Sequence, residues 1–229
     1  NNVGEITHFI ALQEDITEVR RISDEINFQI SHDSLTGLLN RRQFENELTR
    51  IVEHAHKHHS HHVLCFIDID QFKIVNDTCG HMAGDDLLRQ IGNLIRDKLR
   101  SRDILARPGG DEFLMLFENA SLAQGERVIQ MIMNDLKQFR FQWEDHSFPV
   151  EISAGLTVID QQTSSAIGAM QDVDTACYTA KDAGRNRFHI YNDNDEQQLI
   201  RKGYIQWASE IHRALDENSF RLYVQPIVP

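Results

Sequence analysis

Residues 107–113 read Arg-Pro-Gly-Gly-Asp-Glu-Phe, and no other segment constrains the local fold as strongly. Two adjacent glycines permit positive φ angles, and the apolar run at 113–117 that follows is typical of a strand, so we expect a tight hairpin with acid at its tip. Adjacent carboxylates repel each other unless a cation neutralises them. The pattern indicates a divalent-metal site on a turn, with an acidic surface hairpin as the alternative.

The bulk composition narrows the class of protein. The chain has 229 residues, enough for one sizeable domain with flanking pieces, and its net charge of −12 disfavours a nucleic-acid backbone as partner. No apolar run is long enough to span a membrane. Three cysteines without a CxxC motif suggest reduced thiols and a cytoplasmic location, although a parent protein could be membrane-attached.

Histidines are concentrated in one short segment. Six of the twelve lie within residues 54–62. They could bind a transition metal, but no acid or cysteine stands among them to orient the rings. We therefore favour a solvated helix end and loop.

Apolar periodicity predicts the order of the elements. We expect a helix after Asn40, a buried strand at 63–67 ending at Asp68, and a helix with its apolar face at 87–99. Strands at 104–106 and 113–117, a helix at 122–139, a half-buried strand at 150–158, a helix at 173–183 and a strand at 187–191 follow. This order predicts an α+β fold with a ferredoxin-like βαββαβ sheet and flanking helices.

The predicted sheet brings carboxylates together. The first and third strands of such a sheet are commonly neighbours, so Asp68 should lie beside Asp111 and Glu112. Three carboxylates that converge from two elements favour a two-metal site over an isolated acidic turn.

The flanks predict separate pieces. Residues 1–17 begin like a strand, and apolar residues spaced by three and four over 18–31 predict an amphipathic helix, either a coiled coil in a dimer or a plain docked helix. After Tyr191, a polar linker leads to helical spacing at 199–215 and then to the start of a strand at 220–229.

Four motifs in order carry a family resemblance. They are DSLTGLLNRR at 33–42, the block from Asp68 to Asp85 that opens DIDQFKIVND, GGDEF at 109–113 and AKDAGRNR at 180–187. Together they resemble the GGDEF domain of the diguanylate cyclase family, over about residues 32–191. The resemblance implies a nucleotidyl-cyclase-type sheet in a domain at 32–192.

The resemblance also implies a reaction. Two GTP molecules would be joined into cyclic di-GMP with release of pyrophosphate, using two Mg²⁺ or Mn²⁺ ions per active site. Asp68, Asp111, Glu112 and the backbone carbonyl of Ile69 would hold these ions. Asp111 would also be the base, with Glu112 in support, and Lys73 would stabilise charge in the transition state.

Candidate GTP ligands lie in three motifs. A carboxylate can accept hydrogen bonds from guanine N1–H and N2–H together, so Asn76 and Asp85 would read guanine rather than adenine. Asp85 could instead be the N-cap of the helix that follows, and His81 could stabilise a turn rather than lie beside the nucleotide. No P-loop is present, so the candidate phosphate ligands are Lys73, Lys181 and Arg185. By resemblance, Phe72, Gly109 and Gly110 also contact the substrate.

A regulatory site is also implied. Arg100 and Asp103 match RxxD, the family's product-binding inhibitory site, although a surface salt bridge is the alternative. Pro108 departs from the aromatic or aliphatic residue usual at its position and fits a turn entry.

The whole chain resembles a fragment of a tandem protein. Residues 1–17 look like the end of a PAS sensor domain, 18–31 like a signalling helix, and 193–229 like a linker helix with the truncated start of an EAL phosphodiesterase domain. We expect an active, homodimeric diguanylate cyclase. The alternatives are a non-catalytic GTP-binding module that regulates the EAL domain, and a cyclic di-GMP receptor.

Overall fold

The computed structural model describes residues 15–18, 21 and 28–192. The predictions for residues 1–14 and 193–229 lie outside the described residues, and the predicted helix at 18–31 lies largely outside them. Within the described part, none of the helices is long and apolar enough to cross a membrane.

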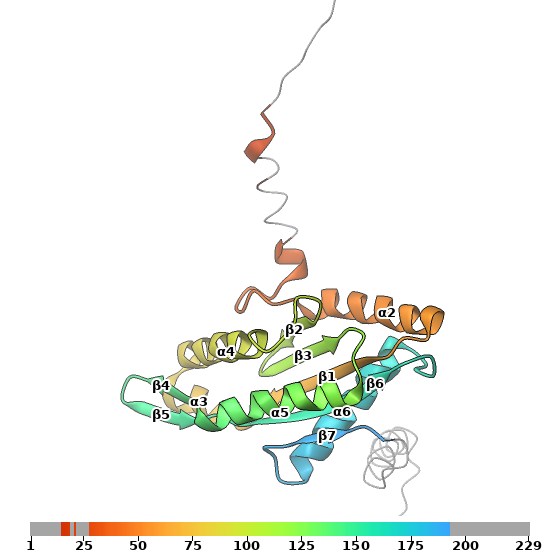
Figure 1. The fold of residues 1–229 in the computed structure, drawn as a ribbon. Helices are drawn as coiled ribbons and strands as arrows, with labels where there is room; N and C mark the ends of the chain where they lie inside the picture. The colour runs from red at the N-terminus through yellow and green to blue at the C-terminus, as the bar shows by residue number, and fades with distance from the viewer. Residues whose placement is uncertain (1–14, 19–20, 22–27, 193–229) are drawn as a thin grey trace, which may run out of the picture.

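A five-stranded sheet in the order β2-β3-β1-β6-β7 forms the centre of the domain (Figure 1). Its strands are β1 (His62–Ile69), β2 (Ile104–Gly109), β3 (Glu112–Phe117), β6 (Ile152–Ile159) and β7 (Phe188–Ile190). Only the β6–β7 pair is parallel. The α+β sheet is therefore confirmed, with β1 between β3 and β6 as in the predicted βαββαβ arrangement.

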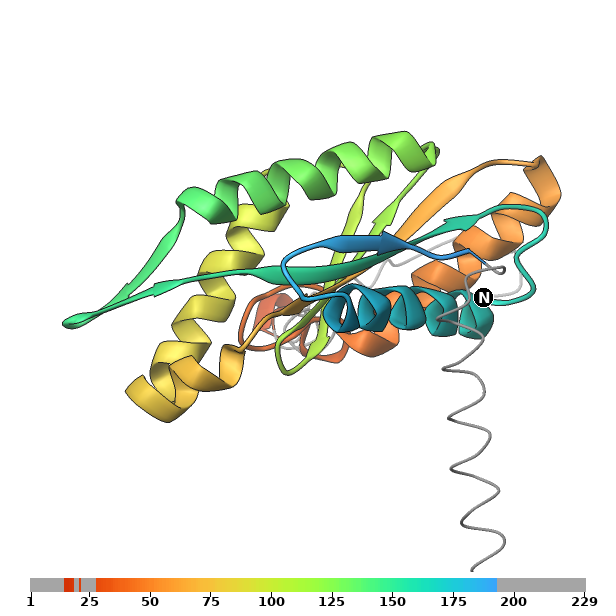
Figure 2. The same ribbon diagram turned by 90° about the horizontal axis from the view of Figure 1, so that it is seen from below.

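Helices cover both faces of the sheet (Figure 2). The helices α2 (Arg41–His58) and α6 (Ala166–Asp182) pack on one face, and α4 (His81–Arg96) and α5 (Leu122–Gln138) pack on the other. The strand residues alternate between the two cores, because successive side chains of a strand point to opposite faces. Phe66 and Leu114 face α2 and α6, whereas Ile67 and Phe113 face the other core.

Polar capping residues mark the positions where three of the helices begin. The side chain of Asn40 accepts a hydrogen bond from the backbone N–H of Gln43 at 3.0 Å, so α2 begins after an N-cap, as the sequence predicts. Ser121 and Gln124 form a capping box at the start of α5. Ser165 caps α6, which therefore begins seven residues before the predicted start at Val173.

The prediction of a half-buried strand at 150–158 is wrong. In β6 only Val158 is exposed, at 36%, and the other seven residues are buried. The physical reason is that α5 packs on one face of β6 and α6 on the other. Alternation of side-chain size along the strand does not predict that helices cover both faces of β6.

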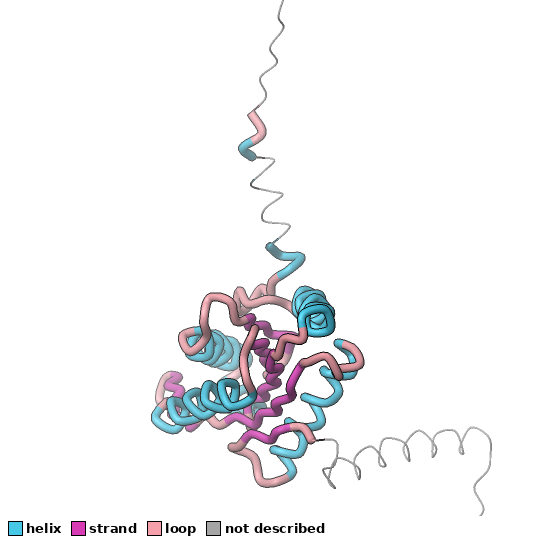
Figure 3. Tube along the Cα trace, turned by 45° about the vertical axis from the view of Figure 1, so that its right-hand side comes forward, coloured by secondary structure: helices cyan, strands magenta, loops and turns pink. Residues whose placement is uncertain are grey.

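Three elements were not predicted. A hairpin of β4 (Arg140–Trp143) and β5 (His146–Pro149) extends from the end of α5 (Figure 1). The short helix α3 (Phe72–Cys79) precedes α4 and is separated from it by Gly80, whose φ of 83° breaks the helix. The tube in Figure 3 shows the strands stacked side by side between helices.

Candidate active site

Two neighbouring strands bring the predicted carboxylates together. Asp68 at the end of β1 pairs with Glu112 at the start of β3, and the N–H of Ile69 donates to the carbonyl of Asp111 at 3.2 Å. Directly paired residues share a face of the sheet, which here is the face covered by α2 and α6. The predicted juxtaposition of Asp68 with the acidic turn is confirmed.

The Gly-Gly turn requires glycine for its conformation. The φ angles are 149° at Gly109 and 57° at Gly110. A Cβ atom added at either residue would meet nothing within 4 Å, so steric crowding within the chain is not the cause. The open space leaves the backbone of the turn accessible to a ligand.

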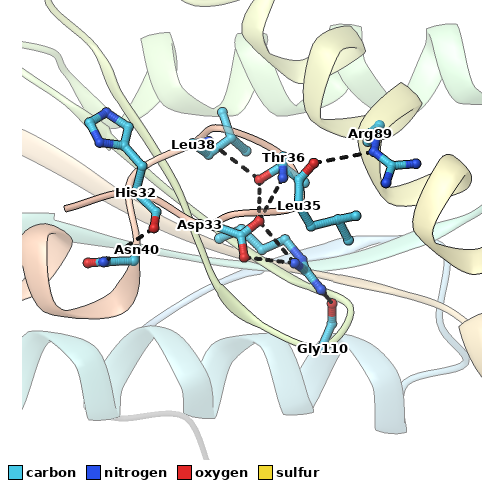
Figure 4. A network of polar contacts seen from close by, with 9 residues as sticks. His32, Asp33, Leu35, Thr36, Leu38, Asn40, Arg89 and Gly110 are labelled. Carbon is cyan, nitrogen blue, oxygen red and sulfur yellow. Dashed lines mark hydrogen bonds and ion pairs between the residues drawn. The ribbon is translucent and has the colours of Figure 1, made fainter. Parts of the chain in front are cut away.

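The buried Arg107 holds this turn in place, and Figure 4 labels two residues that it contacts, Asp33 and Gly110. Arg107 donates from Nε and Nη2 to the carbonyl of Gly110 at 3.0 and 2.7 Å. Its Nη1 lies 3.0 Å from both carboxylate oxygens of Asp33, which also accepts from Thr36 N–H and Oγ1. Burial raises the pKa of Asp33, but these hydrogen bonds outweigh burial and the net pKa is lowered.

Pro108 fits this arrangement without loss of a ladder bond. The pairing of β2 with β3 shifts register between Ala106 and Gly109, so Pro108 lies in an irregular stretch where its missing N–H is tolerated.

The carboxylates are held at an electrostatic cost. Burial, and then the charges of Asp68, Asp111 and Asp174, raise the pKa of Glu112. Burial also raises the pKa of Asp68, and its hydrogen bond to Lys181 only partly offsets this. The charge that accumulates here would be stabilised by a bound cation.

Lys181 supplies one positive charge to this site. Its Nζ lies 2.6 Å from Oδ2 of Asp68, and 13% of the Asp68 side chain is exposed. Burial lowers the pKa of Lys181, but the hydrogen bond to Asp68 and the nearby charges of Asp68, Cys177 and Asp111 together outweigh burial, and the pKa is raised. Lys181 therefore remains charged and reaches the carboxylates from the last turn of α6.

The donor set fits a hard divalent cation. Carboxylates and a backbone carbonyl are the oxygen ligands that Mg²⁺ and Mn²⁺ prefer. In the described part of the chain, no three His, Cys, Asp or Glu residues are already gathered as a metal cage. Lys181 instead contacts one oxygen of Asp68, so a metal would have to share or replace that contact.

The candidate guanine residues lie where α3 meets α4. A Cβ added at Gly84 would lie 2.0 Å from Oδ1 of Asn76 and 3.0 Å from the ring of Phe72, so the side chain of Asn76 packs directly on the bare backbone of α4. Asp85 follows Gly84 and is half-buried. The alternative role of Asp85 as an N-cap is wrong, because α4 begins at His81 after Gly80.

The other candidate substrate ligands lie in different environments. Lys73 is exposed in the first turn of α3, and His81 is exposed at the start of α4. Arg185 lies beyond the end of α6, with its Nε 4.0 Å from Oδ1 of Asp70 and 55% of its side chain exposed. The predicted phosphate ligands Lys181 and Arg185 thus come from a helix end and the turn after it.

Four further residues take part in the site although the sequence pattern predicted no role for them: Asp33, Arg107, Asp70 and Asn186. Asp33 and Arg107 position the Gly-Gly turn, as described above. Asp70 binds the backbone N–H of Asn186 at 3.0 Å. Of the four, only Arg107 lies within a strand, and a charged residue in a strand indicates that it has a partner, which the sequence alone could not identify.

A cleft of about 530 Å³ opens beside the carboxylates. Glu112 and Pro108 line one end, and α2 and α6 form its walls through residues that include Arg41, Met170 and Asp174. The acidic turn therefore faces a space large enough for part of a nucleotide.

The candidate product site has a local turn geometry. The carboxylate of Asp103 accepts from the N–H of Arg100, and the N–H of Asp103 donates to the carbonyl of Arg100, both at 3.0 Å. The residues line a cavity of about 430 Å³ with Arg96 and His32. Across the described residues, no ion pair joins the two side chains, so the salt-bridge alternative is not what the structure contains.

The histidine segment makes structural contacts. His54 Nδ1 and His62 Nε2 both contact Ser60 Oγ, at 2.9 and 2.8 Å, and His56 Nε2 lies 2.8 Å from the carbonyl of Thr163. These bonds join the end of α2 to β1 and to the loop after β6.

Fold and site together define a nucleotide-cyclase type of domain, and comparison with known proteins gives the family. Residues 30–187 match the family described as "Diguanylate cyclase, GGDEF domain". The chain belongs to this family.

Three relatives illustrate the range of the family. The chain is 39% identical over 191 residues to a probable diguanylate cyclase, DgcE of Escherichia coli, covering 83% of this chain and 17% of that protein. It is 33% identical over 228 residues to the cyclic di-GMP phosphodiesterase PdeB of Shewanella oneidensis, covering 99% and 26%. The crystal structure of the coiled coil and GGDEF domain of DgcB from Caulobacter crescentus, in complex with c-di-GMP, has a TM-score of 0.73 at 26% identity and covers 77% and 93%. The chain thus spans about a sixth of the length of DgcE and about a quarter of the length of PdeB.

Proposed function

We propose that this domain is an active diguanylate cyclase that condenses two GTP molecules into cyclic di-GMP and pyrophosphate. The observation that carries the proposal is the pairing of Asp68 with Glu112, which follows Asp111 in the chain. The ammonium group of Lys181 forms an ion pair with Asp68. Relatives named as diguanylate cyclases, DgcE and TpbB, are 39% and 35% identical to this chain over 191 and 195 residues, which supports the proposal. One domain holds one GTP, so the reaction needs two copies facing each other, and the helix at 18–31 would join them as a homodimer.

Each group in the site has a chemical task in this proposal. Bound Mg²⁺ or Mn²⁺ ions, two per site, would lower the pKa of the attacking hydroxyl and neutralise the leaving pyrophosphate. Asp68, Asp111, Glu112 and the carbonyl of Ile69 would hold these ions. Asp111 accepts the proton of the 3′-hydroxyl as that oxygen attacks the α-phosphorus of the GTP held by the other copy.

The remaining residues bind and orient GTP. Asn76 and Asp85 hydrogen-bond guanine beside Phe72 and His81, and the bare backbone of Gly109 and Gly110 lets the nucleotide approach. Lys73, Lys181 and Arg185 neutralise the phosphates, and Lys73 stabilises charge in the transition state.

Turnover of GTP tests the proposal directly. We expect the chain with GTP and Mg²⁺ to form cyclic di-GMP and pyrophosphate, and we expect Asp111→Ala to abolish both products while GTP still binds. The matched control is Asp145→Ala, because Asp145 is an exposed carboxylate on the turn of the β4–β5 hairpin. Full activity of Asp111→Ala would contradict the site assignment.

A second function is favoured by the match to PdeB. A cyclic di-GMP phosphodiesterase that aligns with nearly the whole chain supports a non-catalytic, GTP-binding domain that regulates an adjoining EAL domain. In this proposal the chain is a cytoplasmic part of a PAS–GGDEF–EAL protein that could itself be membrane-attached. Tight GTP binding without product at high protein concentration would favour this function over the cyclase.

Product inhibition is a separate proposal. Arg100 and Asp103 lie together on a cavity edge, where an arginine and a carboxylate can bind the guanine edges or phosphates of cyclic di-GMP. We expect Arg100→Ala to remove inhibition by cyclic di-GMP without changing the initial rate. Unchanged inhibition in that variant would place the inhibitory site elsewhere.

A further inference from the structure

The turn that follows α6 has an unusual backbone. Arg185 and Asn186 have φ angles of 59° and 47°, so two consecutive residues with side chains adopt the left-handed region. Such residues cost free energy and persist only where surrounding contacts hold them. One of the two is the candidate phosphate ligand Arg185.

A buried carboxylate on another element provides these contacts. Oδ2 of Asp70 accepts from the backbone N–H of Asn186 at 3.0 Å, and Oδ1 accepts from Ser153 Oγ at 2.8 Å. Only 2% of the Asp70 side chain is exposed, and the Nε of Arg185 lies 4.0 Å from Oδ1. Both carboxylate oxygens are therefore used inside the protein.

Asp70 is itself fixed by its neighbours. Its N–H donates to the carbonyl of Glu151 at 2.9 Å, and the side chain of Asn186 donates to Oε1 of Glu151 at 2.9 Å. Asp70 also follows Ile69 directly, so the segment that carries the candidate metal-binding carbonyl also holds the turn of Arg185. The two parts of the site are joined through one side chain.

We propose that Asp70 is a positioning residue for phosphate recognition. Its carboxylate holds the turn at 184–187 against the end of β1, so that Arg185 and Lys181 face the triphosphate of one nucleotide. Asp70 acts through Arg185 and does not touch the nucleotide or a metal, because its side chain is only 2% exposed and both oxygens accept hydrogen bonds inside the protein, from Ser153 and Asn186. The inference rests on the proposed GTP site.

The test compares ligands with and without phosphates. Asp70→Asn keeps the shape of the side chain but removes its charge and presents an N–H₂ group to one of the two donors. We expect affinity for GTP with Mg²⁺ to fall about tenfold, as expected for loss of a charge-assisted contact, while affinity for guanosine stays unchanged. A merely structural defect would weaken both ligands alike and would overturn the proposal.

A matched variant and a double variant sharpen the test. Asp77→Asn makes the same change at an exposed carboxylate of α3, and we expect it to leave the GTP-to-guanosine ratio unchanged. An equal loss of GTP affinity in Asp77→Asn would show that removing any nearby negative charge has this effect, and it would overturn the proposal. In an Arg185→Ala background, Asp70→Asn should cause no further loss of GTP affinity. A further tenfold loss of GTP affinity in the double variant would also overturn the proposal.

Two further outcomes are distinguishable. If Asp70→Asn does not fold, the variant Ser153→Ala, which removes the hydrogen bond to Oδ1 of Asp70, should show the same selective loss of GTP affinity, and unchanged GTP affinity would reject the proposal. If the unmodified chain binds guanosine but not GTP, both the proposed function and this inference fail. GTP binding that is insensitive to Asp70→Asn rejects the inference alone.

Discussion

Arg107 and Asp33 lie 74 residues apart in the chain, and the guanidinium of Arg107 contacts both carboxylate oxygens of Asp33 at 3.0 Å. The other side of the same guanidinium binds the carbonyl of Gly110. The segment around Asp33 and the acidic turn are thus held together by one largely buried ion pair. The side chain of Arg107 is 10% exposed, and that of Asp33 is 17% exposed.

Removing this arginine should destabilise the domain. Arg107→Ala leaves the carboxylate of Asp33 without its charge partner, so we expect the free energy of unfolding to fall by about 3 kcal/mol in urea titrations. Arg41→Ala is the control, since its pair with Glu45 is exposed and is worth less than about 1 kcal/mol. Equal effects of the two variants would contradict this interpretation.

Gly84 should be needed for guanine recognition. A Cβ at this position would overlap Oδ1 of Asn76, so Gly84→Ala must displace that side chain. We expect GTP affinity to fall about tenfold and the preference for GTP over ATP to narrow, measured by calorimetry. Gly92→Ala in the same helix is the control, because its Cβ would lie 3.4 Å from Leu38 Cδ1. If only Gly92→Ala weakens binding, the guanine site is misplaced.

Protonation of His62 should weaken the fold in acid. Burial, and then the charge of His54, lower the pKa of His62 below 6.5, and its Nδ1 accepts the N–H of Asn119 at 3.1 Å. The unfolded chain therefore binds this proton more readily, so the contribution of His62 is present above pH 6.5 and declines as the pH falls below it. The free energy of unfolding measured against pH should show a shallower acid decline in His62→Gln than in the exposed control His58→Gln.

The thiols should differ sharply in reactivity. Burial raises the pKa of Cys177 to about 12, and burial also raises the pKa of Cys65. Thiolates are the reactive form, so we expect only the half-buried Cys79 to react with a thiol reagent at pH 8 in the folded protein. All three should react in denaturant, and rapid labelling of two thiols in the native state would contradict the buried core.

Much of the fold followed from local patterns. The apolar run that ends at Asp68 and the strand after the Gly-Gly turn predicted β1 and β3, and strand order predicted their pairing. The patterns did not reveal that β6 is covered on both faces or that Gly80 separates two helices. Those features depend on contacts between segments that are far apart in the chain.

The sequence by itself determined the class of protein and the candidate residues of the site, because four motifs with fixed spacing placed carboxylates, glycines and cations in a recognisable order. Only the tertiary structure decided what holds them in place. Asp33 with Arg107, and Asp70 with Asn186, are pairs of residues from distant segments. A hydrogen bond depends on distance and direction in space, and the chain's order alone does not specify either until the sheet and its helices are packed.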